Sequence, residues 1–232
     1  FRDNEGRWHT YRLSPCVSER DGSEAYTDAA PVGIDKLGAV YTRDGTCQPG
    51  AEVVPLTASK SRLLSTINNF RAEGYTAGHL GTAWAWYLVS PEWASVLPQG
   101  SAPGSYSDPK VKKVAVLFTD GEYNLQYDAA GIATRENGGG AKNGLADAQA
   151  RQVCDNMKKT GIAVFTVGFN LREAKAIETL ARCASSDGQS YLADDGEAEM
   201  ARLDDAGMHR PHRHLVHPVA GHLHEGIGGI IG

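Results

Sequence analysis

The feature that most constrains the fold is an unbroken apolar run, Val114 to Phe118, followed at once by Thr119, Asp120 and Gly121. Five apolar residues rich in strand formers are too few for a helix and are typical of a strand covered on both faces. In open parallel sheets, ligand sites gather at the carboxyl ends of strands. Asp120 therefore has two interpretations: a ligand for a hard cation, or a turn residue that bonds its own backbone.

Helical and strand patterns alternate after this run. The spacing predicts a helix over about 144–160, a strand over 162–167, a helix over about 173–185, a short strand over 191–193 and a final helix over 197–203. Such alternation is typical of a parallel sheet whose right-handed crossovers put helices on both faces. The sequence therefore predicts an α/β fold with a doubly wound, mostly parallel sheet.

Two helices are expected before the run. The first begins at Thr57 or Ser59, either of which can cap it, and stops at Gly74. The second passes through Trp84 to Leu88 and is closed by Pro91. Between Asp120 and the helix at 144, the glycines at 138–140 indicate a long loop. Lys142 is followed by Asn143, which excludes a phosphate-binding loop.

The ends of the chain differ from the middle. Residues 1–56 lack periodicity and are predicted to be a loop-rich insertion of the same domain, with a short strand within Val32–Thr42; residues 57–206 form the core. Residues 207–232 are predicted to be a poorly ordered tail. Six of the eight histidines lie in the tail, where they could bind zinc or nickel, although no helix or strand frames them: His209, His212, His214, His217, His222 and His224.

Composition and charge exclude several classes of function. A chain of 232 residues with a net charge of −5 and a pI near 5.9 is a poor partner for nucleic acid or an anionic membrane. No apolar stretch reaches the length of a membrane span. Because Phe1 opens in mid-sequence, we expect that an upstream segment has been lost.

Four cysteines fall into two local pairs, Cys16 with Cys47 and Cys154 with Cys183. An even count fits disulfides in an oxidising compartment, and it also fits four buried thiols. A bridge between the second pair requires that their two helices lie on the same face of the sheet, or that a helix end reaches round its edge. Export from the cytosol is favoured.

Thr76 and Asp120 together suggest a cation site. A loop threonine and a strand-end aspartate can converge above a parallel sheet and offer the oxygen ligands that Mg²⁺ or Ca²⁺ takes. Such an ion would accept a carboxylate from a protein partner. Alternatively, Thr76 only caps the following helix. A third possibility is a hydrolase, because Gly74 to Gly78 formally matches G-x-S-x-G with threonine as nucleophile, although a helix instead of a strand precedes it.

The same residues resemble a known family. Val114-Ala-Val-Leu-Phe-Thr-Asp-Gly-Glu122 and the upstream Gly74-Tyr-Thr-Ala-Gly-His-Leu-Gly81 look like a von Willebrand factor type A (vWA) domain. The longer runs 76–93 and 108–122 resemble the C-terminal region of bacterial TadG-like proteins of the tight-adherence (Tad/Flp) pilus system. This resemblance covers roughly residues 10–205.

The resemblance implies a non-enzymatic adhesion or assembly module in the bacterial cell envelope, membrane-anchored through the missing upstream segment. It implies a metal-ion-dependent adhesion site in which Thr76 and Asp120 match two of three motif elements. The third element, D-x-S-x-S, is absent: Asp21-Gly-Ser-Glu-Ala25 lacks the second serine. We therefore expect that the metal site and the sheet's first strand are completed upstream of Phe1. A vWA scaffold that binds no metal is the alternative.

Overall fold

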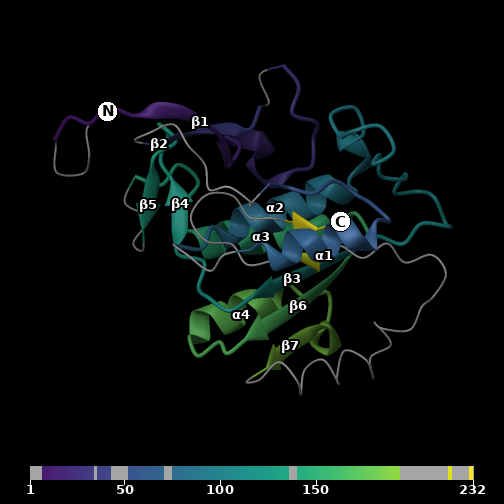
Figure 1. Cartoon of the computed structure of the whole chain (residues 1–232). Coiled ribbons are helices and arrows are strands. Elements are labelled where there is room, and N and C mark those ends of the chain that lie inside the picture. The colour runs from purple at the N-terminus through teal and green to yellow at the C-terminus, as the bar shows by residue number, and fades with distance from the viewer. Residues whose placement is uncertain are drawn as a thin grey trace.

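The computed structural model describes residues 7–33, 36–42, 52–70, 75–135, 140–193, 219–220 and 230–231. Its main sheet contains three parallel strands in the order β3 (Val114–Thr119), β6 (Ala163–Phe169) and β7 (Ser190–Ala193) (Figure 1). The apolar run is thus a strand, paired along its whole length with β6. The predicted parallel α/β sheet is confirmed.

Three helices cover one face of this sheet: α2 (Gly78–Val89), α3 (Ala146–Lys159) and α4 (Ala174–Cys183). Residues of α2 and α3 form one buried apolar cluster with Ala115 and Leu117 of β3. Leu180 of α4 packs against Gly168, on the same face of β6. The helix expected over 197–203 lies outside the described residues.

A disulfide joins two of these helices. Cys154 on α3 and Cys183 on α4 are bonded, with Cα atoms 5.0 Å apart. The same-face arrangement that such a bridge requires is therefore present. Cys16 is also disulfide-bonded, and Cys47 lies outside the described residues.

Helix α1 (Lys60–Asn68) begins at the second of the two predicted caps. The Ser59 hydroxyl accepts a hydrogen bond from the Arg62 N–H, which satisfies one of the free amides of the first turn. The predicted stop, Gly74, lies outside the described residues. At the end of α2, Pro91 opens a short 3₁₀ helix, η2 (Pro91–Trp93).

The N-terminal segment is more regular than predicted. It contains an antiparallel pair, β1 (Arg12–Ser18) and β2 (Gly38–Thr42), with a 3₁₀ turn, η1 (Gly22–Tyr26), between them. Only β2 falls within the strand expected at 32–42. The β1 strand was not predicted because it contains Pro15 and few apolar residues. Residues 19–28, here called the N-terminal strap, follow β1 and run along α2. Glu19 contacts His79 at the start of this helix, and Asp28 contacts Ser90 at its end.

The prediction of a long loop after Asp120 is partly wrong. It contains a second hairpin, β4 (Leu125–Tyr127) and β5 (Ala133–Arg135). Gly131 in the intervening turn has a φ of 72°, and a Cβ there would lie 1.9 Å from the Ala39 carbonyl oxygen of β2. Only glycine lets the two hairpins approach this closely, and Figure 1 shows them side by side at one end of the molecule.

The C-terminal residues that the structure describes are two short paired strands, β8 (Val219–Ala220) and β9 (Ile230–Ile231). Strand β8 contacts β3, and β9 contacts α2. The six tail histidines lie outside the described residues. Within the described ranges, no helix is both long and apolar enough to cross a membrane. A last 3₁₀ turn, η3 (Asp187–Gln189), leads into β7.

Candidate cation site at the edge of the sheet

Asp120 lies in a turn at the carboxyl end of β3, and its residue is exposed. The turn is held by the preceding threonine. The Thr119 hydroxyl accepts from the Gly121 N–H and donates to the Gly121 carbonyl oxygen, each at 3.2 Å. Because Thr119 itself is buried in the strand, it fixes the position of the Asp120 backbone relative to the sheet.

Thr76 is held against the chain that follows this turn. Its carbonyl oxygen accepts from the N–H groups of Asn124 and Leu125 at 3.0 and 3.1 Å, and its own N–H donates to Asn124 Oδ1 at 2.9 Å. The Thr76 residue is only 6% exposed, and a Cβ added to Gly121 would lie 3.5 Å from its Oγ1. The structure therefore brings the Thr76 hydroxyl against the Asp120–Gly121 turn.

A glycine and a tyrosine explain this close approach. Gly78 starts α2, and a Cβ at that position would lie 2.1 Å from the Tyr123 ring. The ring occupies the space that a larger residue would need. Burial raises the pKa of Tyr123 to about 12. A hydrogen bond with Thr82, one turn along α2, opposes this rise and is outweighed by burial. The contributions of Tyr123 and Asn124 were not predicted from the sequence, where Gly78 was noted only as part of two motifs. A glycine at a helix start was the one available signal.

Thr76 does not act as the cap of α2. The N-cap residue is Ala77, and no side chain caps this helix. The hydroxyl thus remains directed at the turn, which argues against the simpler interpretation of Thr76. The G-x-S-x-G elbow requires a strand before it, whereas the described element that precedes Thr76 is helix α1. His79, next to this motif, is hydrogen-bonded to Glu19, with Nε2 3.0 Å from Oε1. Asp21, from the incomplete D-x-S-x-S match, pairs with Lys142 in a different cluster.

The donors at this edge are a hydroxyl and a carboxylate. Among the residues that the structure describes, no group of three or more His, Cys, Asp or Glu side chains could hold a metal. Two oxygen donors at one turn fit part of the coordination shell of Mg²⁺ or Ca²⁺, which bind hydroxyl, carboxylate, carbonyl and water oxygens.

A cavity of about 200 Å³ opens beside the turn. Glu122 and Asn124 line it on one side, and Asp147 and Lys175 line it on the other. Burial acts to raise the pKa of Asp147, but Lys175 at 3.0 Å and Arg151 at 2.7 Å outweigh burial and lower it. Asp147 is therefore charged and paired, and the cavity offers polar contacts next to the cation edge.

Comparison with known proteins identifies the fold family. The family description of the von Willebrand factor type A domain matches residues 48–206, more than half of the chain. This protein therefore belongs to the vWA domain family. No curated protein matches its sequence.

Solved structures that resemble this chain include the pilus adhesin SpaC from Lactobacillus rhamnosus GG in an open conformation. It shares 14% identity, with a TM-score of 0.45, over 82% of this chain and 24% of the SpaC chain. A second structure of that adhesin gives 13% identity and a TM-score of 0.46, over 83% and 24% of the two chains. The chain spans about a quarter of SpaC, and this likeness carries no functional argument.

Proposed function

We propose that this vWA domain is a non-enzymatic adhesion or assembly module that binds a protein partner through a divalent cation. Thr76 Oγ1 and the Asp120 carboxylate hold the ion, and the partner supplies a carboxylate to it. The observation that carries the proposal is the packing of the Thr76 hydroxyl against the Asp120–Gly121 turn. Family membership supports a cation at this position.

The roles of the two residues follow from their surroundings. Thr76 is buried and fixed through both its backbone groups, so it can present one oxygen in a constant direction. Asp120 is exposed and supplies negative charge. A neutral hydroxyl and a single carboxylate leave a bound Mg²⁺ or Ca²⁺ with positive charge to share with a partner carboxylate. Further ligands are expected from a D-x-S-x-S segment, which this sequence lacks.

We also propose a place for the module. The likeness of residues 76–93 and 108–122 to TadG-like proteins supports a bacterial Tad/Flp pilus system at the cell envelope, with a membrane anchor in the longer protein. The Cys154–Cys183 disulfide supports an oxidising compartment outside the cytosol. The partner is then a pilus-assembly or envelope protein.

The test is a titration of this chain with Mg²⁺ and, separately, Ca²⁺, followed by the backbone NMR signals of Thr76, Asp120 and Gly121. We expect shifts confined to these residues and their neighbours, at millimolar ion because the ligand set is incomplete. Thr76→Ala and Asp120→Asn should abolish the shifts. Thr76→Ser restores the hydroxyl and should retain them.

Two results would count against the proposal. Absence of any local shift at tens of millimolar ion would favour the scaffold that binds no metal. Equal shifts in the Asp120→Asn variant would place the ion elsewhere. Hydrolysis of an ester substrate that Thr76→Ala removes would instead support an enzyme.

A further inference from the structure

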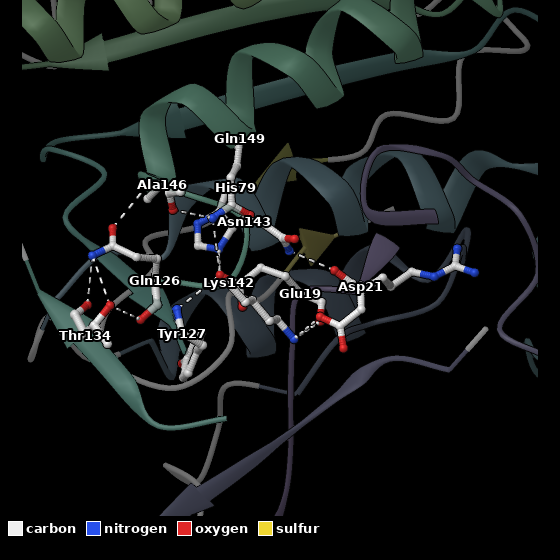
Figure 2. A network of polar contacts seen from close by, with 12 residues as sticks. Glu19, Asp21, His79, Gln126, Tyr127, Thr134, Lys142, Asn143, Ala146 and Gln149 are labelled. Carbon is white, nitrogen blue, oxygen red and sulfur yellow. Dashed lines mark hydrogen bonds and ion pairs between the residues drawn. The ribbon is translucent and has the colours of Figure 1, made fainter. Parts of the chain in front are cut away.

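A cluster of buried polar groups, here called the Glu19 junction, includes His79, three residues after Thr76. Neither the cation site nor the family match accounts for it. Figure 2 shows its centre, the Glu19 side chain, which reaches in from the end of β1. Glu19 is 5% exposed. Its Oε1 accepts from His79 Nε2 at 3.0 Å, the Tyr127 N–H at 3.1 Å and Gln149 Nε2 at 3.3 Å. One carboxylate thus joins α2, β4 and α3.

The bonds at Glu19 are strong enough to keep it charged. Burial acts to raise the pKa of this carboxyl, but the hydrogen bond and charge of His79 and the Tyr127 N–H outweigh burial and hold the pKa below its ordinary value. Because a carboxylate only accepts, the hydrogen in the shared bond belongs to His79 Nε2. The Glu19 backbone is held as well, since its carbonyl oxygen accepts from Lys142 Nζ at 2.7 Å.

Glu19 and Thr76 connect the same two pieces of chain. Thr76 binds the backbone of Asn124 and Leu125. His79 lies three residues after Thr76, and Tyr127 lies two residues after Leu125. Both of these residues donate a hydrogen bond to Glu19. The start of α2 is therefore joined to β4 at two points, to its first residue, Leu125, by Thr76 and to its last, Tyr127, by Glu19.

A small cavity completes the junction. Ser18 Oγ, Glu19 Oε2 and His79 Nδ1 are buried and have no hydrogen-bond partner among the described residues. All three residues line one cavity of about 10 Å³, the size that holds a single water. A water that donates to Glu19 Oε2, accepts from the Ser18 hydroxyl and bonds His79 Nδ1 satisfies all three atoms. It donates to Nδ1 when the ring is neutral and accepts from Nδ1–H when the ring is charged.

We propose that Glu19, with one water bound in this cavity, is the positioning residue of the candidate cation site formed by Thr76 and Asp120. Its hydrogen bonds hold α2 against β4 and thereby fix the direction of the Thr76 hydroxyl. The proposal deepens the proposed function and rests on it for its consequence, cation binding. The fastening itself is independent of any ion. It assigns a role to a segment that lies outside the family match at 48–206.

The experiment compares Glu19→Ala, Glu19→Gln and a matched control, Glu92→Gln, which changes an exposed glutamate at the opposite end of α2. Amide hydrogen exchange is followed by NMR at Thr76 and Leu125, whose N–H groups form the Thr76 contacts, and along β3. In Glu19→Ala we expect exchange at Thr76 and Leu125 to accelerate roughly tenfold or more, with β3 unchanged.

Glu19→Gln keeps an oxygen that can accept from His79 and Tyr127, so it should restore most of the protection, and Glu92→Gln should change nothing. Unchanged exchange at Thr76 in Glu19→Ala overturns the proposal. If Glu19→Ala loosens all amides alike, Glu19→Gln decides: acceleration confined to Thr76 and Leu125 supports positioning, and uniform acceleration overturns it.

A Mg²⁺ titration of the same variants separates the two proposals. A several-fold weaker response in Glu19→Ala, partly recovered in Glu19→Gln, supports both. If the unaltered protein gives no Mg²⁺ response while the Thr76 amide still depends on Glu19, the cation proposal fails and the fastening stands. Refinement of an ordered water within reach of Ser18, Glu19 and His79 in a high-resolution crystal structure supports the cavity assignment, and a cavity without density overturns it.

Discussion

Two parts of the molecule are held together in different ways. The helices over the main sheet meet in an apolar cluster that includes Leu88, Trp93 and Met157, and a disulfide ties α3 to α4. The N-terminal strap, residues 19–28, packs Tyr26 against this cluster but is also attached through polar groups at both ends of α2. Glu19 binds His79 at the start of the helix, and Asp28 accepts from Ser90 at its end.

The difference teaches where each part gets its specificity. Apolar contacts are non-directional and tolerate small shifts, whereas a buried carboxylate is stable only with every partner in place. The strap therefore restricts the positions of the two ends of α2, and of Tyr127 at the end of β4, more tightly than the apolar cluster can. We expect substitutions in the cluster to affect global stability most, and substitutions in the strap to affect local geometry.

The largest effect is expected for Trp93→Ala, because Trp93 is part of the apolar cluster and also contacts the strap. Its ring is 2% exposed and stacks on Tyr87 with centroids 4.1 Å apart, and its Nε1 donates to the Asp28 carbonyl oxygen. Deletion of a buried tryptophan costs about 3–5 kcal/mol. Urea unfolding measures the loss. Trp8→Ala, at 73% exposure, is the control and should cost under about 0.5 kcal/mol.

If Trp93→Ala lowered the free energy of unfolding as little as its control, Trp93 would not link the strap to the apolar cluster, and the proposed division of the molecule into these two parts would be wrong.

The next largest effect is expected for removal of the Cys154–Cys183 bond, which closes a sequence separation of 29 residues. Replacing both cysteines by alanine should lower the free energy of unfolding by about 2–4 kcal/mol. Because the bond joins α3 to α4, amide exchange at the Glu19 junction should change only through global stability. Selective loosening of Thr76 in this variant would contradict the separation of the two parts.

Much of the fold could be predicted because its signals are periodic. The strand at Val114, the alternation from 144 to 193 and the Ser59 cap follow from apolar spacing and local hydrogen bonding. The hairpin at Leu125–Arg135 could not be predicted, since its strands are three residues long and one of them buries Gln126. The β1 strand was hidden by Pro15, and its residues pair with β2 residues far along the chain, from Ser18 with Gly38 to Arg12 with Thr42.

The candidate site divides in the same way. Thr76 and Asp120 stand out in the sequence because each lies next to the end of an element, Thr76 before α2 and Asp120 after β3. Asn124, Gly78 and Glu19 act through contacts with residues distant in the sequence, such as the 60-residue separation between Glu19 and His79. No local pattern identifies a buried carboxylate, because in sequence Glu19 is one charged residue among polar neighbours. Such partners become visible only when the fold brings them together.

A pH-dependent effect of intermediate size should separate the two parts further. The pKa values of Glu19 and Asp147 lie below their ordinary values of 4.5 and 3.8. Each carboxylate therefore contributes stability that is fully present above its ordinary pKa and is lost as pH falls through the lower folded value. We expect a steep loss of stability below about pH 4.5, measured by urea unfolding at a series of pH values.

Glu19→Gln keeps the acceptor oxygen but loses the charge, so it should cost about 1 kcal/mol at neutral pH and flatten part of this acid-dependent loss. The dependence that remains reports Asp147, whose partners Arg151 and Lys175 lie outside the strap. An unaltered pH profile in Glu19→Gln would mean that the strap carboxylate does not contribute to acid stability.

The smallest effect is expected for Ser18→Ala, which tests whether the strap junction needs every polar atom satisfied. Ser18 is 1% exposed, and its Oγ borders the cavity beside Glu19 and His79. Loss of the hydroxyl removes one of three partners of the proposed water, so the cost should be about 0.5–1.5 kcal/mol. Urea unfolding measures it, with the exposed Ser61→Ala on α1 as control. A gain in stability would show that the Ser18 hydroxyl is left unsatisfied in the folded protein, and would contradict the water proposed for this cavity.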